Sequence, residues 1–220
     1  SIRLGDNQLT GNIPSEIGYL TNLRYLNLNT NQLEGDIPQE IGNLINLKGL
    51  FMHENQFSGN IPSEIGELIN LESLWLNDNR FSGSVPSEIT NLFNLHTLTI
   101  NNNLLEDLPS ITGLASLGYL FIDNNNFTFE DIEPNIGVVN TFVYSPQDLV
   151  GETQEITIGE GDDYALAVNV GGEYNIYQWY KDDAVITGAN SAEYHIADAD
   201  FYDEGIYECR ITNTVATQLT

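Results

Sequence analysis

The sequence is poor in cysteine and in basic residues. It holds one cysteine among 220 residues, and 6 lysines and arginines stand against 32 aspartates and glutamates, which gives a formal net charge of −26. A single cysteine excludes a disulfide within the chain, which suits the cytosol and also secreted proteins that fold without disulfides. A surface this acidic repels nucleic acid and anionic lipid, so we expect no nucleic-acid partner.

Long hydrophobic runs are also missing. No apolar stretch approaches the length of a membrane span, and no signal peptide is present, so we expect no membrane insertion by this part of the protein. The chain starts at Ser1 in the middle of a repeat. Because repeat arrays need capping units, we expect a cap and further sequence before Ser1.

What the sequence does have is a regular repeat. An asparagine recurs every 24 residues and then once after 22; the series is Asn7, Asn31, Asn55, Asn79, Asn103 and Asn125. Two apolar columns two residues apart precede it: Ile2, Leu26, Leu50, Leu74, Leu98 and Leu120, then Leu4, Leu28, Met52, Leu76, Ile100 and Ile122. Residues two apart on a strand share a face, so these columns predict stacked strands around one core, in a repeat solenoid.

The stretch from Leu68 to Val85 shows the full pattern, L-x-x-L-x-L-x-x-N-x-L-x-G-x-I-P. It resembles the plant-type leucine-rich repeat, which implies a parallel β-sheet on one face and a second extended segment in each coil. We expect residues 1–137 to form this solenoid, with 127–137 as its closing segment.

Residues 138–220 follow a different pattern, in which short β-rich runs alternate with glycine and acidic turns, as is typical of an all-β sandwich. Trp179 and the D-x-G-x-Y-x-C motif of Asp203, Gly205, Tyr207 and Cys209 resemble an immunoglobulin-like domain. Val168 stands where that family has its first cysteine, so the resemblance implies a sandwich without the disulfide between its sheets.

The two modules together resemble secreted bacterial leucine-rich repeat proteins that carry an immunoglobulin-like module after the solenoid. Plant receptors of this repeat type usually flank the solenoid with cysteine pairs, which this chain lacks. The resemblance therefore implies a bacterial protein that is secreted or at the cell surface.

The outward strand positions carry the candidate binding site. Parallel strands about 4.8 Å apart stack these positions into columns, which places aromatic and polar side chains side by side. The candidate ligand-binding residues are Tyr25, Phe51, His53, Trp75, Asn77, Tyr119 and Phe121. Exposed aromatics with polar neighbours suit a protein ligand and also the apolar faces of sugars; alternatively, they cover one another and stabilise the sheet.

No arrangement of residues predicts catalysis, a metal site or a cofactor. The recurring asparagines fit a structural role within the turns. The polar runs 123–126 and 159–163 lack the residue order of a calcium loop. Cys209 fits a core thiol better than a nucleophile. We therefore expect a non-enzymatic binding or adhesion module, with two alternatives: a structural stalk, or the carbohydrate-recognition region of a larger secreted protein.

Overall fold

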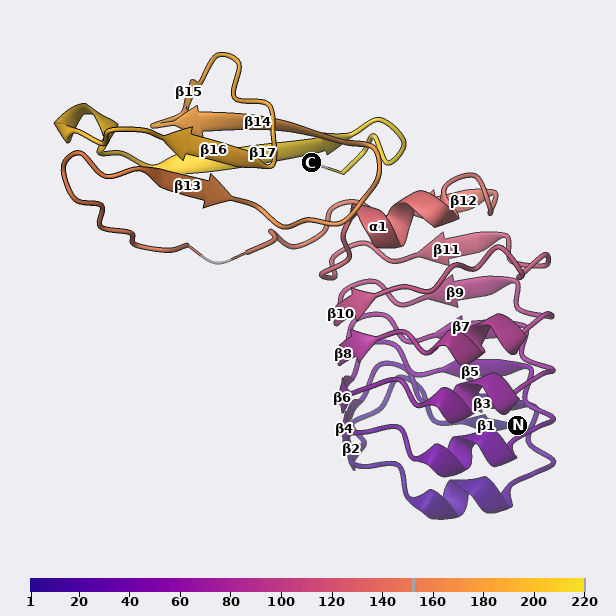
Figure 1. Cartoon of the computed structure of the whole chain (residues 1–220). Helices are drawn as coiled ribbons and strands as arrows, with labels where there is room; N and C mark the ends of the chain where they lie inside the picture. The colour runs from indigo at the N-terminus through magenta and orange to yellow at the C-terminus, as the bar shows by residue number, and fades with distance from the viewer. Residues whose placement is uncertain (152, 220) are drawn as a thin grey trace.

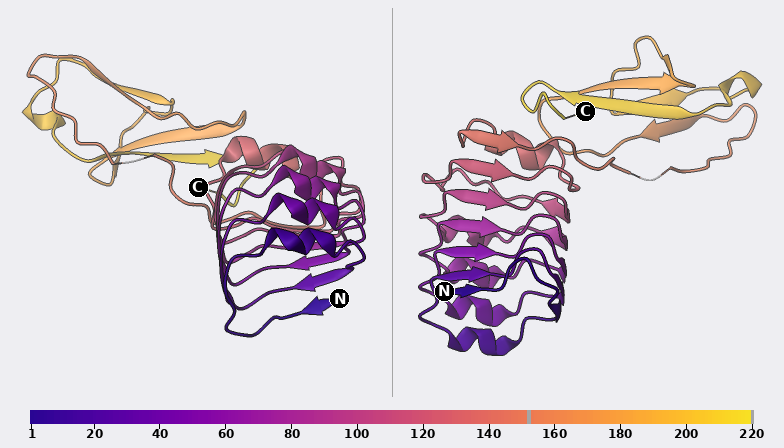
Figure 2. Two further views of the ribbon diagram at one scale, coloured as in Figure 1. Left: turned by 90° about the horizontal axis from the view of Figure 1, so that it is seen from below. Right: turned by 180° about the vertical axis from the view of Figure 1, so that it is seen from behind.

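The computed structural model describes residues 1–151 and 153–219. A stack of coils begins at the N-terminus, and a unit of β-strands lies at the far end of the stack (Figure 1). The two views of Figure 2 show the same arrangement, with the N-terminus at the opposite end of the stack from the β-strand unit.

The parallel sheet that the repeat predicts forms one face of the stack, and it has seven strands, one more than the six members of each core column (Figure 2, right). Its strands are β1 (Ile2–Arg3), β3 (Tyr25–Asn27), β5 (Gly49–Phe51), β7 (Ser73–Trp75), β9 (Thr97–Thr99), β11 (Tyr119–Phe121) and β12 (Thr141–Val143). The register pairs Leu50 with Leu74 and Phe51 with Trp75, so core residues and outward residues each form columns. We call the outward side of this sheet the open face.

The strand β12 lies beyond residue 137, the expected end of the solenoid. It pairs with β11, with Leu120 opposite Phe142, so the stack continues past that residue. Gln147 then takes the place of the repeat asparagine: its Nε2 donates to the carbonyls of Ile122 and Tyr144 at 3.0 and 2.6 Å. This is a seventh coil, in which Gln147 follows Asn125 by 22 residues.

A second parallel sheet runs through the next segment of each coil. Its strands are β2 (Thr10–Gly11), β4 (Gln32–Gly35), β6 (Gln56–Gly59), β8 (Arg80–Ser84) and β10 (Leu104–Asp107). The glycine of the repeat has a positive φ, 71° at Gly59 and 69° at Gly83, which explains why the motif requires glycine there.

Short 3-10 helices lie opposite the open face, and the sequence interpretation did not include them. They are η1 (Ser15–Tyr19), η2 (Gln39–Asn43), η3 (Ser63–Glu67) and η4 (Ser87–Asn91), each directly after a proline. A Cβ on Gly66 would lie 2.6 Å from the carbonyl oxygen of Glu88, so glycine permits the close stacking of neighbouring helices. The coil after η4 has no such helix, and the matching residue of η4 is Thr90.

The core is continuous along the solenoid, and the repeat asparagines link adjacent coils through hydrogen bonds to the backbone. Leu50, Leu74 and Leu98 are fully buried. The Asn79 side chain donates to the Met52 and Leu76 carbonyls and accepts the Phe57 N–H, with distances of 3.0 to 3.1 Å. These bonds confirm the structural role expected of the asparagines, because they satisfy backbone groups of two adjacent coils.

Two helices, α1 (Phe129–Ile132) and η5 (Glu133–Asn135), precede β12, the last strand of the stack. The helix begins with a capping box in which Asp131 accepts the backbone N–H of Thr128 at 2.9 Å. Asp131 is buried and also accepts the Leu108 N–H at 3.0 Å, which ties the helix to the preceding coil.

The C-terminal unit consists of antiparallel β-strands. A two-stranded sheet contains β13 (Tyr164–Ala167) and β16 (Glu193–Ile196); a three-stranded sheet contains β15 (Ala184–Val185), β14 (Asn175–Lys181) and β17 (Tyr207–Asn213); the 3-10 helix η6 (Phe201–Asp203) precedes β17. The ring of Tyr194 lies between Trp179 and Tyr207, at 6.1 and 5.9 Å, and joins the two sheets.

The joint between the units has specific contacts. The Glu133 carboxylate accepts the N–H groups of Glu173 and Tyr174, at 2.9 and 3.2 Å, and also bonds the side-chain amide of Asn213. Ala216 and Leu219, near the C-terminus, are buried in the same core as the last coils of the solenoid. The C-terminal segment therefore helps to close the end of the stack.

Candidate functional site

An aromatic pair occupies the middle of the open face. The rings of Phe51 on β5 and Trp75 on β7 meet edge to face, with centroids 5.3 Å apart. Gly49, two residues before Phe51 on β5, leaves room for the Phe51 ring. A Cβ on Gly49 would lie 2.6 Å from the Phe51 ring and 3.0 Å from the Tyr25 ring. Trp75 remains 36% exposed. The pair is thus fixed by its own packing and still offers an indole surface to solvent.

His53 lies against the same tryptophan, 5.3 Å between ring centroids. Among the described residues, its Nδ1 atom is buried without a hydrogen-bond partner. Burial lowers the pKa of His53 below its ordinary value, although the nearby carboxylates of Glu54 and Asp78 oppose the shift. The imidazole is therefore predominantly neutral at neutral pH and extends the aromatic surface.

The expected site residue Asn77 is committed to its neighbours. Its Oδ1 accepts the hydroxyl of Thr99 at 2.9 Å, and its Nδ2 donates to Asp78 at 2.6 Å. Asp78 also accepts the side-chain amide of Asn102 at 2.7 Å. This network fixes the Asn77 and Asp78 side chains, just after β7, in one arrangement.

A hollow in the open face extends from this cluster across β9 to β11. Its lining consists of His53, Glu54, Trp75, Asn77, Thr97, Thr99, Asn101, Tyr119 and Phe121. Tyr119 is 53% exposed, which makes it the most accessible aromatic of the lining. The residues on β9 are short and polar, so they form the floor between the aromatic residues of β7 and β11.

The hollow contains five of the seven expected site residues: His53, Trp75, Asn77, Tyr119 and Phe121. Tyr25 and Phe51 lie outside its lining and continue the aromatic surface toward β3 through the contact of Phe51 with Trp75. The sequence interpretation missed Glu54, Thr97, Thr99 and Asn101 as lining residues. They lie in or beside the same outward columns, so the spacing could have found them, but their small or common side chains gave no reason to choose them.

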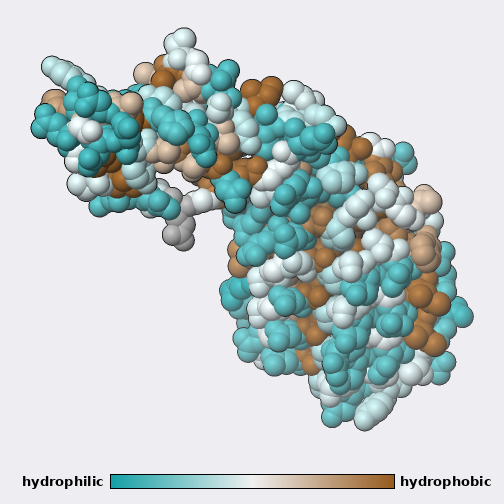
Figure 3. Space-filling view, in the orientation of Figure 1, coloured by the Kyte–Doolittle hydropathy of each residue, from teal (hydrophilic) through white to brown (hydrophobic). Residues whose placement is uncertain are grey.

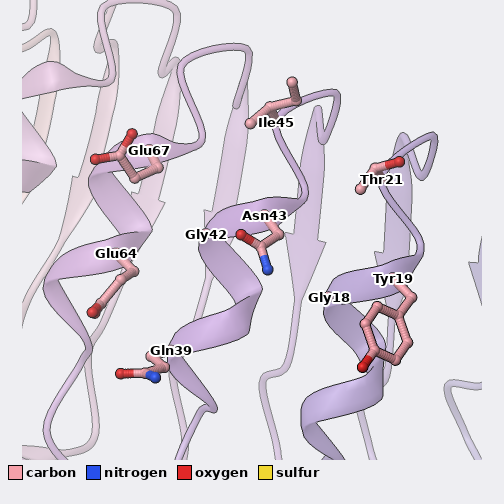
Figure 4. A pocket seen from close by; sticks show the side chains of 9 residues that line it. All are labelled: Gly18, Tyr19, Thr21, Gln39, Gly42, Asn43, Ile45, Glu64 and Glu67. Atoms are coloured by element: carbon pink, nitrogen blue, oxygen red, sulfur yellow. The ribbon is translucent and has the colours of Figure 1, made fainter.

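A second groove lies on the opposite side, across the 3-10 helices (Figure 4). Tyr19, Asn43 and Glu67 border it from successive coils. Nearby, Ile45, Ile69 and Phe93 are exposed at equivalent positions of three coils. The space-filling view of this side shows hydrophobic side chains in lines along the stack, between broad hydrophilic bands (Figure 3).

Metal-ligating side chains are scattered. In residues 1–151 and 153–219 no three histidine, cysteine, aspartate or glutamate side chains are grouped to hold a metal ion. Cys209 is partly buried, and burial raises the pKa of its thiol, so the reactive thiolate is disfavoured. Its partial exposure differs from the core position expected.

Comparison with known proteins identifies the repeats. The Leucine Rich Repeat family profile matches residues 22–44, 46–68 and 70–92. The structure is similar to the ectodomain of the receptor kinase SOBIR1 from Arabidopsis thaliana, with 32% identity and a TM-score of 0.54, over 57% of this chain and 69% of that one. The chain belongs to the leucine-rich repeat family. A search of curated protein sequences finds no match.

Two further solved structures are similar to this chain. The ectodomain of GASSHO1/SCHENGEN3 from Arabidopsis thaliana, solved in complex with CASPARIAN STRIP INTEGRITY FACTOR 2, has 35% identity and a TM-score of 0.61 over 66% of this chain. An internalin from Listeria monocytogenes has 26% identity and a TM-score of 0.50 over 66%. This chain spans 18% of the first and 40% of the second. Among the described residues, no helix is long and apolar enough to cross a membrane.

Proposed function

We propose that the protein is a non-enzymatic extracellular binding module whose open face recognises a segment of another protein. The observation that carries this proposal is the exposed aromatic surface of Phe51, Trp75 and Tyr119 beside a polar-floored hollow. Tryptophan and tyrosine are enriched among the residues that dominate binding energies, and here the packing of Phe51 and His53 fixes the indole before a ligand arrives.

The similar structures support a binding role. The GASSHO1/SCHENGEN3 ectodomain was solved in complex with CASPARIAN STRIP INTEGRITY FACTOR 2, and the similarity to an internalin supports placing this chain in a bacterial surface or secreted protein. In that setting the module would serve adhesion.

We assign the C-terminal unit to the immunoglobulin-like sandwiches, as spacer or second contact. Three observations support this: β13 pairs with β16 and β14 with β17 in separate sheets, Trp179 is 4% exposed, and the Tyr207 hydroxyl donates to the Asp203 carbonyl at 2.9 Å. The last resembles the tyrosine corner of that fold. Because β12 and Gln147 belong to the stack, we place the start of this domain after Asp148 rather than at residue 138.

Phage-displayed random dodecapeptides, panned against the protein, test the proposal. We expect enriched peptides whose affinity falls by about tenfold or more in Trp75→Ala and in Phe51→Ala, because central aromatic residues contribute about 2 kcal/mol or more to interfaces. Phe93→Ala is the matched control: it removes an exposed phenylalanine from the opposite side and should leave affinity unchanged.

A glycan array, run with the same variants, tests the two alternative functions, a carbohydrate-recognition region and a structural stalk. Sugar binding that depends on Trp75, without any enriched peptide, would make the open face a carbohydrate site. Neither peptide nor glycan binding at the open face would leave the structural stalk. Circular dichroism of each variant excludes loss of fold as the cause.

A further inference from the structure

The charges of the open face are separated across its width. Acidic residues follow the strands: Asp6, Glu54, Asp78 and Asp123 come at or just after the last outward position. Basic residues precede two strands, at Arg24 and Lys48, and Arg3 lies within β1 at the N-terminal end of the sheet, four strands from β9. Lys48 is neutralised locally, since its Nζ lies 2.5 Å from the Glu72 carboxylate.

The acidic edge keeps its charge. Glu54 accepts a hydroxyl from Thr30 at 3.2 Å and Asp78 accepts two amide groups, so both carboxylates are oriented by neutral donors. Arg80, two residues beyond Asp78, is the first residue of β8, and among the described residues it forms no ion pair with Asp78. Each carboxylate retains acceptor capacity for a further donor.

The hollow joins this edge to the aromatic surface. Glu54 and Trp75 line it together, and its lining contains no lysine or arginine. A guanidinium or ammonium group over an exposed indole gains a cation–π attraction, and a carboxylate beside the ring adds a charge-assisted hydrogen bond. A cation at Trp75 would therefore meet both.

The dimensions suit a peptide that crosses the strands. From β7 to β11 there are two strand intervals, or about 10 Å, because β9 lies between them. An extended peptide covers that distance in about three residues. One side chain can thus lie on Trp75 while another, apolar one lies on Tyr119 and Phe121.

We propose that the ligand is a basic peptide segment, with an arginine or lysine held between Trp75 and the Glu54–Asp78 edge and an apolar residue about three positions away on β11. This rests on the proposed function, since it names the chemistry of the ligand for the same open face.

The test uses the dodecapeptides enriched by panning, with Glu54→Gln and Asp78→Asn as the variants. Both substitutions remove one charge and keep the size, and asparagine is well suited to the positive φ of 55° at Asp78. Glu67→Gln and Glu106→Gln remove the same charge from exposed positions outside the open face and serve as matched controls. Synthetic peptides with each arginine or lysine replaced by glutamine complete the set.

We expect enriched peptides to be basic, to lose about tenfold in affinity with Glu54→Gln plus Asp78→Asn at low salt, and to bind more weakly as salt rises to about 0.15 M. The controls should change affinity far less. Neutral or acidic peptides that depend on Trp75 but not on Glu54 or Asp78 would overturn the basic ligand and leave the open face as the binding site. Peptides indifferent to Trp75 would overturn the open face itself.

Discussion

The solenoid and the C-terminal unit are stabilised by different kinds of contact. In the solenoid every coil repeats the same contacts, so that Leu50, Leu74 and Leu98 are fully buried and the asparagines satisfy backbone groups at each turn. In the C-terminal unit the strands are largely half-exposed, and order depends on a few side chains such as Trp179 and Ile196. Repetition distributes stability along the stack, whereas the second unit concentrates it in single contacts.

The largest expected effect compares one substitution in the two regions. Leu74→Ala creates a cavity between two neighbouring coils and should lower the free energy of unfolding by about 3 kcal/mol. Leu166→Ala, on β13, removes a half-exposed side chain opposite Tyr194 and should cost about 1 kcal/mol. Denaturant unfolding measures both. Equal losses would mean that the second core is as tightly packed as the first.

A smaller effect is expected at the joint. Glu133→Gln removes the charge that the N–H groups of Glu173 and Tyr174 bond, and should cost about 1–2 kcal/mol. Hydrogen exchange at these two amides should accelerate, while the amides of β5 and β7 stay protected. Glu173→Gln is the control, because it changes an exposed side chain and keeps the backbone bond. Unchanged exchange in Glu133→Gln would show that the joint is held by Ala216 and Leu219 instead.

The smallest effect is a pH dependence within the C-terminal unit. Burial raises the pKa of Tyr207 to about 12, above its ordinary value of about 10. A folded-state pKa above the unfolded value contributes stability that is present below pH 10 and is lost as pH rises toward 12. Tyr207→Phe also loses the bond to the Asp203 carbonyl, about 1 kcal/mol at neutral pH. The difference in stability between wild type and variant should shrink between pH 10 and 12, and a constant difference would contradict the assignment.

The solenoid could be predicted because its period repeats the same physical requirement. The core columns, the parallel strands and the neighbouring positions of Phe51 and Trp75 follow from spacing alone. The seventh coil was missed because Gln147 replaces asparagine, although its longer amide reaches the equivalent carbonyls.

Other features depended on contacts between coils, which no single repeat encodes. The close stacking of η2 and η3 on the next coil leaves no room for a Cβ at Gly42 or Gly66, and this need for glycine appears only when two coils are placed together. The hollow likewise forms because Thr97 and Thr99 are short beside Trp75 and Tyr119. Its shape is set by differences between neighbouring side chains, whereas the columns revealed only their positions.

The two tryptophans lie in different units, so tryptophan fluorescence can report on each unit separately. The chain contains two, Trp75 on the open face and Trp179 within the C-terminal unit, and they are 36% and 4% exposed. A ligand that covers the indole of Trp75 removes it from water and shifts its fluorescence emission to shorter wavelength, while Trp179 keeps its emission. In a Trp179→Phe background the emission comes from the open face alone, so occupancy of the hollow can be followed in solution without a label on either partner.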